Sequence, residues 1–299
     1  MKFCAIFVTY NPCIDKLIKV FLALLMQDDL YIVVVDNSSS NIDELKSLRD
    51  IDKRIKIIEM NNNSGIAKAQ NIGINAAISI QSEYVIFFDQ DSCVDGSFIA
   101  DLYADFRKII DKGLKVAAIG PRFIDEKEHF YFPALRLNKN NLMDKFSVEN
   151  ITEPVEVSFL ISSGTLVDVQ ALHDIGSMRE EFFIDFVDTE WCFRAIDKGY
   201  KLYISEKAIM THSIGDDTIR IWHFKIPVHS GFRRYYRIRN LFFMWKLPYI
   251  PKELVIKLMI SNFFHQILLF TLKDKKIDYI RYYWKAVKDG FKQSRNYNG

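Results

Sequence analysis

Short apolar runs alternate with helical patterns along the first half of the chain. The runs are rich in Val, Ile and Phe, as buried strands are, and they lie at residues 3–8, 31–35, 55–59 and 84–88. Between them, apolar residues recur at helical spacing at about 15–27, 43–48 and 66–79. Strands that alternate with helices predict a doubly wound, mainly parallel α/β sheet flanked by helices. The turns after the first, second and fourth strands then line one crevice.

The second half of the chain changes character twice. Further strands are predicted at 116–120, 155–161 and 166–169, with a helix at 169–175, whereas residues 123–149 are polar and irregular and favour an insertion. Beyond Arg220 the pattern becomes helical, and Pro248 and Pro251 interrupt it. We therefore expect an α/β domain over residues 1–219 and a helical region over residues 220–299.

The net charge of +2 hides a strong asymmetry. Residues 220–299 carry 17 Lys and Arg against 4 Asp and Glu, whereas the preceding residues carry 23 against 34. Trp and Tyr are interleaved with these basic residues, a combination that favours an anionic membrane surface or an anionic substrate held there. A merely solvated basic face is the alternative. No nucleic-acid recognition module is found, so we expect no nucleic-acid partner.

The most apolar stretch of the basic region is residues 254–272. It contains Lys257, Asn262, His265 and Gln266, which argue against a helix that spans a lipid bilayer. We expect an interfacial or partly buried amphipathic helix instead.

The cysteines and the first residues predict the compartment. Cys4, Cys13, Cys93 and Cys192 are scattered without a CxxC pair or a metal-ligand spacing, which favours reduced thiols. Met1 and Lys2 lead directly into a strand pattern with no secretory leader. We expect a cytoplasmic protein associated peripherally with the inner face of the plasma membrane.

The most informative polar group follows the fourth predicted strand. Asp89, Gln90 and Asp91 come directly after five apolar residues, and parallel strands deliver functional groups at their carboxyl ends. Two carboxylates facing a crevice suit a hard divalent cation that keeps open positions for phosphate oxygens. The alternative is a solvated Asp-rich turn.

These loop residues form an ordered set with further motifs along the chain. The members are Val8-Thr9-Tyr10-Asn11-Pro12, Val35-Asp36-Asn37-Ser38, residues 62–73, Asp89-Gln90-Asp91 and residues 183–192. The set resembles inverting glycosyltransferase family 2, which has the GT-A fold, over about residues 3–245. The Asp-Gln-Asp-Ser form and Phe-Val-Asp-Thr-Glu-Trp-Cys resemble its bacterial rhamnosyltransferase branch.

The resemblance implies a nucleotide-sugar site in these loops. Asp36 would accept the imide N–H of a uracil or thymine base, beside Thr9 and the turn at Asn11; its alternative is an Asx turn. The start of a helix, where the dipole favours a diphosphate, carries further members of the site. The residues assigned to the donor are Thr9, Asn11, Asp36, Asn63, Gly65, Lys68, Asp89, Gln90 and Gly164. Gly65 as a turn glycine and Lys68 as a solvated helix residue are the alternatives.

The same resemblance implies a divalent metal, Mg²⁺ or Mn²⁺. Asp89 would approach the donor ribose, and Asp91 would ligate the metal that bridges the diphosphate. His212 matches a position where many GT-A enzymes supply a further ligand, although a lone His is more often structural. The metal would offset charge on the departing nucleoside diphosphate.

Inverting transfer also needs a carboxylate that removes the acceptor hydroxyl proton. By resemblance this general base is Asp188. Many relatives have Glu-Asp here, but this chain has Val187 before Asp188, which leaves Asp185 and Glu190 as alternatives. Asp188 as the N-cap of the next helix is a structural alternative.

A cluster of arginines follows the predicted sugar site. Arg233, Arg234 and Arg237 lie within seven residues of Gly231, and guanidinium groups bind phosphate in a bidentate manner. They are candidate contacts for the diphosphate of the acceptor or donor; a salt-bridged helix face is the alternative.

Taken together, the resemblance implies transfer of L-rhamnose from dTDP-L-rhamnose. The acceptor would be a polyprenyl-diphosphate-linked saccharide in O-antigen or capsule synthesis, and residues 123–149 would lie on the acceptor side. No residue reports a 6-deoxy sugar on physical grounds. A UDP-sugar donor and a non-catalytic nucleotide-sugar binding scaffold are therefore the alternatives.

Overall fold

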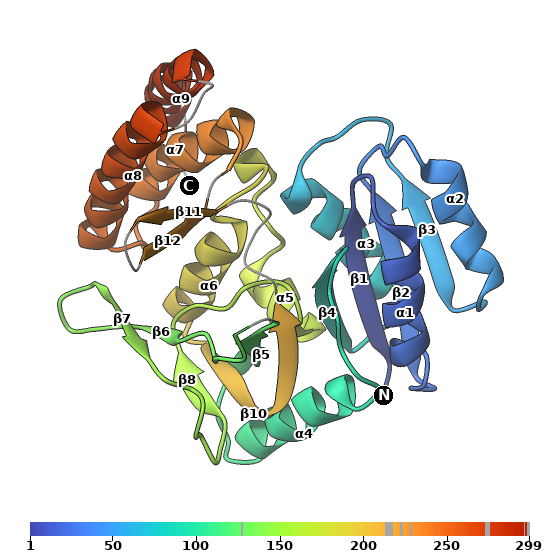
Figure 1. The fold of residues 1–299 in the computed structure, drawn as a ribbon. Coiled ribbons are helices and arrows are strands. Elements are labelled where there is room, and N and C mark those ends of the chain that lie inside the picture. The colour runs from blue at the N-terminus through green and yellow to red at the C-terminus, as the bar shows by residue number, and fades with distance from the viewer. Residues whose placement is uncertain are drawn as a thin grey trace.

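The computed structural model describes residues 1–126, 128–212, 218–221, 224–227, 229–272, 276–295 and 297, and the side chains of residues 212–228 lie outside that description. An eight-stranded central sheet has the order β3-β2-β1-β4-β9-β5-β10-β8. Helices cover both of its faces, and a group of three helices stands beside one end (Figure 1). The sheet strands are β1 (Phe3–Thr9), β2 (Leu30–Asp36), β3 (Ile55–Glu59), β4 (Tyr84–Asp89), β5 (Val116–Asp125), β8 (Val155–Val157), β9 (Leu166–Asp168) and β10 (Lys201–His212).

The strand pairing confirms the mainly parallel, doubly wound α/β sheet. β1 pairs in parallel with β2 and β4, β2 with β3, and β10 with β5. The short strand β9 lies antiparallel between β4 and β5, and β8 is antiparallel to β10. The carboxyl ends of β1, β2 and β4 therefore meet at one edge, as the alternation of strands and helices predicts.

The side chains of β1 show how the sheet is buried on both faces. Cys4 and Ile6 face one core together with α3 (Ile66–Ser79), α6 (Val187–Asp197) and α7 (Gly231–Lys246). Phe3 and Phe7 face a second core together with α1 (Ile14–Leu24) and α4 (Phe98–Ile110). The first core continues through Leu247 and Val255, so the C-terminal helices share apolar packing with the sheet domain.

Smaller elements complete the chain. They are α2 (Ile42–Ser47), the 3₁₀ turns η1 (Leu48–Asp50) and η2 (Glu180–Phe182), α5 (Val169–Ile175), β6 (Ala134–Leu137), β7 (Met143–Phe146), β11 (Thr218–Ile221), β12 (Phe224–Pro227), α8 (Lys252–Leu272) and α9 (Lys276–Arg295).

Four sequence-based expectations need correction. β5 continues to Asp125, and the β6–β7 hairpin lies in the segment expected to be irregular. β8 ends at Val157 because the next backbone N–H, of Ser158, bonds to Leu135 of that hairpin instead. The region after Arg220 opens with the β11–β12 hairpin, and its first helix begins at Gly231. The hairpin strands β6, β7, β11 and β12 have four residues each, and a periodicity this brief is hard to detect in a sequence.

Candidate active site

The carboxylate of Asp36 lies at the carboxyl end of β2 and is fully buried. The Thr9 hydroxyl donates to its Oδ1 at 2.9 Å, and the Ser39 backbone N–H donates to its Oδ2 at 2.8 Å. The Ser39 hydroxyl donates to Oδ1 as well. Asp36 therefore bonds to the backbone three residues on, not two as in the Asx turn given as its alternative role, and it also joins the ends of β1 and β2.

Two amide side chains tie the neighbouring loops together. The Gln90 side chain accepts the Tyr10 backbone N–H at 2.8 Å, which connects the loops after β4 and β1. Asn11, at φ +49°, accepts from the Ser40 backbone N–H at 2.8 Å and connects the loops after β1 and β2. Thr9, Asn11, Asp36 and Gln90 are thus gathered at one edge, where Thr9 and Asp36 bond to each other and Asn11 and Gln90 bond to the neighbouring loops.

The start of α3 has a partner that the sequence does not indicate. The backbone carbonyl of Phe183 accepts from the N–H groups of Ile66 and Ala67, at 2.7 and 3.4 Å. Gly65 has φ +88°, and a Cβ there would lie 2.6 Å from Phe183. The Phe183 carbonyl therefore occupies the helix end at which the resemblance places the diphosphate, and a diphosphate at these two N–H groups must displace it. Asn63 accepts the Gly65 N–H at 3.1 Å, and Lys68 is exposed.

The end of β4 meets the segment 162–165. The Ser163 hydroxyl accepts the Asp89 backbone N–H at 3.2 Å and bonds to the Ser92 hydroxyl at 3.1 Å. Gly164 has φ +72°, and a Cβ there would lie 2.7 Å from Met210. The close packing of Gly164 against Met210 therefore requires glycine at this position, whether or not the donor sugar is bound.

The candidate metal ligands lie on neighbouring segments. Asp91 is exposed in the loop after β4, and the backbone of Cys93 pairs with Thr211 near the end of β10. This pairing brings the Asp91 loop beside the strand that ends at His212, whose side chain is outside the described residues. Among the described side chains, no three of the His, Cys, Asp and Glu type cluster tightly enough to hold a metal.

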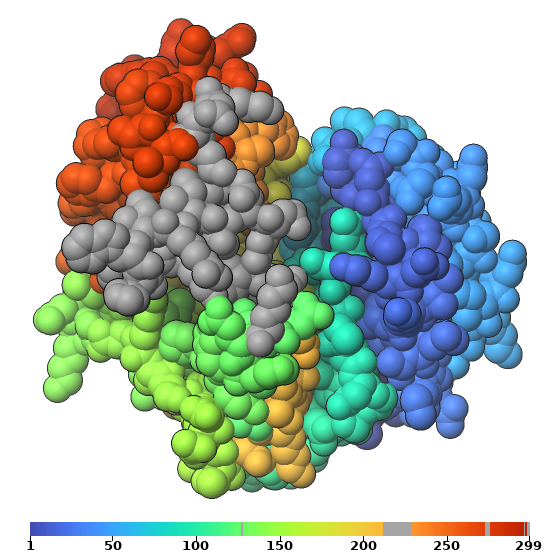
Figure 2. Space-filling view, in the orientation of Figure 1, coloured from blue at the N-terminus to red at the C-terminus, as the bar shows by residue number. Residues whose placement is uncertain are grey.

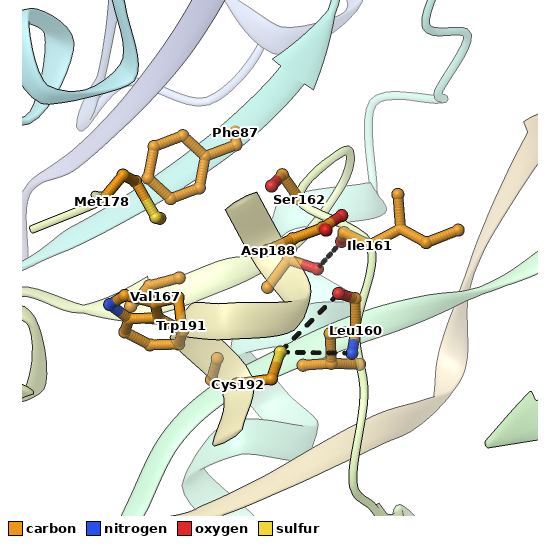
Figure 3. Close-up of a pocket in the computed structure, with 11 residues that line it drawn as sticks. Phe87, Leu160, Ile161, Ser162, Val167, Met178, Asp188, Trp191 and Cys192 are labelled. Atoms are coloured by element: carbon orange, nitrogen blue, oxygen red, sulfur yellow. Dashed lines mark hydrogen bonds between the residues drawn. The ribbon is translucent and has the colours of Figure 1, made fainter. Parts of the chain in front are cut away.

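Asp188 lies in the first turn of α6 beside a small apolar cavity of about 20 Å³ (Figure 3). The residues around the cavity include Phe87, Leu160, Met178 and Trp191. Burial raises the pKa of Asp188 to about 6, backbone N–H groups of Thr189 and Ser162 oppose this rise, and the charges of Asp185 and Asp89 add to it. A carboxylate with this pKa is ionised at neutral pH and is basic enough to accept a proton.

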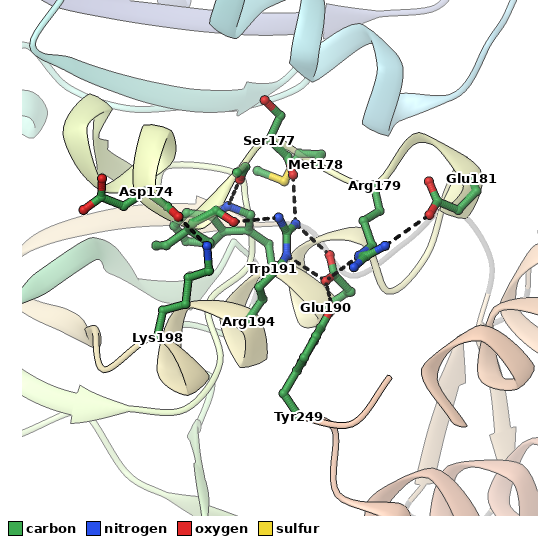
Figure 4. Close-up of polar contacts among 12 residues, drawn as sticks. Asp174, Ser177, Met178, Arg179, Glu181, Glu190, Trp191, Arg194, Lys198 and Tyr249 are labelled. Carbon is green, nitrogen blue, oxygen red and sulfur yellow. Dashed lines mark hydrogen bonds and ion pairs between the residues drawn. The ribbon is translucent and has the colours of Figure 1, made fainter. Parts of the chain in front are cut away.

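The two alternative carboxylates have other partners. Asp185 accepts from Arg233 Nε and Arg237 Nη1, both at 3.2 Å. Glu190 is fully buried and accepts from Arg179 Nε at 3.2 Å and Arg194 Nε at 2.8 Å (Figure 4). Of the three candidates, Asp188 is therefore the one that lines this cavity, and it lacks a cationic side chain among its described contacts.

The arginine cluster separates into two groups. Arg233 and Arg237 both bind Asp185, so one acid faces two cations at the start of α7. Arg234 points elsewhere: it is 1% exposed and bonds to Asn262 and Gln266 of α8. The structure brings Arg233 and Arg237, but not Arg234, toward the Asp188 segment.

The loop before Asp188 is held in a strained conformation. Phe183, Asp185 and Phe186 all have φ between 63° and 64°, which costs free energy for residues other than glycine. Asn240 of α7 stabilises it, because its side-chain nitrogen lies 2.8, 2.9 and 2.9 Å from the carbonyl oxygens of Phe182, Ile184 and Asp185, which share its two N–H groups. α7 therefore fixes the backbone that leads into the Asp188 helix.

Sequence comparison gives the family. The profile of glycosyl transferase family 2 matches residues 4–176. The dTDP-rhamnosyl transferase RfbF of Shigella flexneri is 38% identical over 290 residues, which are 96% of this chain and 95% of that protein. The chain belongs to glycosyl transferase family 2. The hexosyltransferase Agl10 of Haloferax volcanii, which acts in low-salt glycan biosynthesis, is 24% identical over 83% of this chain and 78% of its own length.

Solved structures confirm the GT-A fold of this glycosyltransferase. TarS of S. aureus superposes with a TM-score of 0.58 at 18% identity, over 98% of this chain and 81% of that one. GalNAc-T7 with UDP, GalNAc and Mn²⁺ superposes with a TM-score of 0.60 at 13% identity, over 99% of this chain and 58% of that one.

The sequence analysis missed several residues that support the site. One of them, Arg194, has a local signal, because it lies four residues after Glu190 on one helix. Arg179, Tyr249 and Asn240 have none, since they reach the Asp188 helix or its loop from distant segments.

Proposed function

We propose that this family 2 enzyme transfers L-rhamnose from dTDP-β-L-rhamnose to a saccharide in surface polysaccharide synthesis, with inversion. The similarity to a dTDP-rhamnosyl transferase over nearly the whole of both chains supports the donor. The cavity-lining carboxylate of Asp188, with its pKa near 6, supports the chemistry and is the observation that carries the proposal.

Asp188 is the general base of this mechanism. Its carboxylate accepts the proton of the acceptor hydroxyl while the oxygen attacks the anomeric carbon from the face opposite the nucleotide. The carbon–oxygen bond to dTDP breaks as the new glycosidic bond forms, which converts the β-linked donor to an α-linked product. The apolar surroundings keep the carboxylate poorly solvated, which strengthens it as a base.

The donor occupies the edge formed by the ends of β1, β2 and β4. Asp36 and Thr9 recognise the base, and the two loops that carry Asn11 and Gln90 hold the nucleoside. Asn63, Gly65 and Lys68 lie toward the diphosphate, once Phe183 has moved from the end of α3. Asp89 approaches the ribose, and Gly164 flanks the sugar.

Asp91 fits a divalent cation, Mg²⁺ or Mn²⁺, and His212 is the further assigned ligand. A carboxylate oxygen is a ligand that these ions prefer, and Mg²⁺ usually completes its shell with water and substrate phosphates rather than protein. The backbone pairing of Cys93 with Thr211 brings the strand that ends at His212 alongside the Asp91 loop. When bound, the metal supplies positive charge to the departing diphosphate.

The acceptor is a saccharide on polyprenyl diphosphate, presented at the cytoplasmic face of the inner membrane. The basic C-terminal region and the excess of positive charge at Arg233 and Arg237 support an anionic acceptor. If this is right, label from dTDP-L-rhamnose enters the organic-soluble fraction of added lipid-linked saccharides. Label confined to water-soluble acceptors contradicts it.

Donor turnover tests the proposal. The purified protein is assayed with Mg²⁺ or Mn²⁺ on dTDP-L-rhamnose, UDP-glucose and UDP-galactose. Release of dTDP from the first donor alone is the expected result. Release of UDP from either of the others keeps the enzyme class and overturns the rhamnose assignment.

A further inference from the structure

The solvent-facing side of α8 is apolar. Its exposed residues follow one another at intervals of three and four, so they form one stripe along the helix. They are Ile256 (45% exposed), Ile260 (53%), Phe263 (49%), Ile267 (45%) and Phe270 (41%), with Phe264 (64%) beside them. A continuous patch of this kind on a protein surface marks an interaction site.

The inward side of α8 is polar where it meets α7. Arg234 is buried there without a carboxylate among its hydrogen-bond partners, and it donates to Asn262 Oδ1 at 2.8 Å and Asn262 O at 3.0 Å. Gln266 Oε1 accepts from Arg234 Nη2 at 3.3 Å, while Gln266 Nε2 donates to the Tyr279 carbonyl of α9 at 2.8 Å. Because these amides face Arg234, the apolar residues on the opposite side of this part of α8 face outward.

The neighbouring helix α9 adds charge to this surface. Six of its residues are exposed cations, against one exposed acid, Asp278; the cations are Lys276, Arg281, Lys285, Lys288, Lys292 and Arg295. α9 also exposes Ile277 (81%) and Trp284 (65%). The two helices form the outer rim of the molecule, coloured orange to red in the space-filling view (Figure 2).

An anionic lipid surface fits these features better than the other occupants. A second copy of the chain would bring two positively charged α9 helices together, which like-charge repulsion opposes. α8 is long and apolar enough to span a bilayer by length and composition, and it is the one described helix that is. Spanning, however, would remove Asn262 and Gln266 from Arg234 and leave a buried cation without acceptors, at a cost of several kcal/mol.

We propose that α8 lies along the surface of an anionic bilayer, inserts its apolar stripe among the lipid headgroups, and is held there by the cations of α9. This deepens the membrane location proposed above and rests on it. Shallow insertion combined with attraction to anionic lipid is how interfacial helices bind. It would place the arginines at the start of α7 close to a lipid-linked diphosphate.

Flotation of the full-length protein with vesicles tests this proposal. Vesicles of phosphatidylcholine, alone or with added phosphatidylglycerol, are compared for wild type, Ile260→Glu/Phe264→Glu and Lys285→Glu/Lys288→Glu. Leu22→Glu is the matched control, because Leu22 is 54% exposed on α1, away from the C-terminal helices. Hydrolysis of dTDP-L-rhamnose without vesicles is measured in parallel, so that a failed donor assignment is separated from a failed membrane surface.

The proposal predicts that wild type binds the anionic vesicles and that Ile260→Glu/Phe264→Glu lowers the partition coefficient about tenfold or more. Lys285→Glu/Lys288→Glu should weaken binding to anionic vesicles alone, whereas Leu22→Glu should bind like wild type. Equal binding by Ile260→Glu/Phe264→Glu and wild type overturns the proposal. The proposal is also overturned by a different pair of results. In that case wild type is a dimer by light scattering and fails to float with vesicles, and Ile260→Glu/Phe264→Glu is a monomer.

Discussion

Arg194 and Glu190 form a two-point ion pair one turn apart on α6, with Nε–Oε1 and Nη2–Oε2 distances of 2.8 and 3.0 Å. Glu190 also accepts from Arg179 and from the Tyr249 hydroxyl. Since Tyr249 lies between α7 and α8, this carboxylate joins the Asp188 helix to the C-terminal region (Figure 4).

Glu190→Gln should therefore destabilise the fold strongly. Two guanidinium groups around a buried site would lose their counter-charge, which costs about 3–5 kcal/mol. Urea unfolding monitored by circular dichroism measures the change. Glu181→Gln is the control, because Glu181 is exposed and meets the same Arg179 at 3.5 Å; it should change stability by less than about 1 kcal/mol. Equal effects of the two variants would contradict this role for Glu190.

Asp188→Asn should stabilise the protein at neutral pH. The pKa of Asp188 is about 6 in the fold and ordinarily 3.8. Its protonated form therefore favours folding below pH 4, and this contribution is lost as the pH rises through 6. The ionised group then costs up to about 3 kcal/mol, which Asn removes. Urea unfolding at pH 7 and pH 4 measures the difference between variant and wild type. If Asp188→Asn stabilises the protein as much at pH 4 as at pH 7, the charge of Asp188 is not the source of the effect.

The rate of transfer should rise with pH through the titration of Asp188. Because the base acts in its ionised form, kcat should increase about tenfold per pH unit below a midpoint near pH 6 and level off above it. The midpoint is measured from transfer rates with dTDP-L-rhamnose over a series of pH values, with the stability of the protein checked at each pH. A midpoint below pH 4.5 would show that the carboxylate that limits the rate is not buried.

Removal of divalent metal should stop turnover, and Mg²⁺ or Mn²⁺ should restore it. Asp91→Asn should raise the metal concentration for half-maximal rate about tenfold or more, because one charged oxygen ligand is lost. Asp95→Asn is the matched control on the same loop, where Asp95 bonds to the Ser97 N–H and hydroxyl at 3.0 Å. The same metal dependence in Asp91→Asn and wild type would remove Asp91 from the ligand set.

The sequence predicts the elements that have a clear local pattern. The strands that end at Thr9, Asp36 and Asp89 are each a continuous apolar run followed by polar residues, and the structure has all three at one edge. No local pattern predicts the contact of Phe183 with the start of α3. The contact depends on the strained backbone at Phe183, which is more than 100 residues from α3 along the chain.

The orientation of α8 shows the same limit. Asn262 and Gln266 are visible in the sequence as polar residues in an apolar helix, and in a soluble protein such residues would be expected to face water. The buried Arg234 turns them inward instead, and its contact with them joins residues about 30 positions apart. Periodicity identifies the two sides of the helix but not which one is covered.

Whether Asp188 is the base is tested most directly by measuring dTDP release from dTDP-L-rhamnose by wild type and Asp188→Asn, alongside calorimetric binding of dTDP. We expect the variant to lose turnover by at least about 10²-fold, as for the loss of a positioned general base, and to bind dTDP like wild type. Turnover within about threefold of wild type, with binding intact, would contradict the assignment of Asp188 as the base.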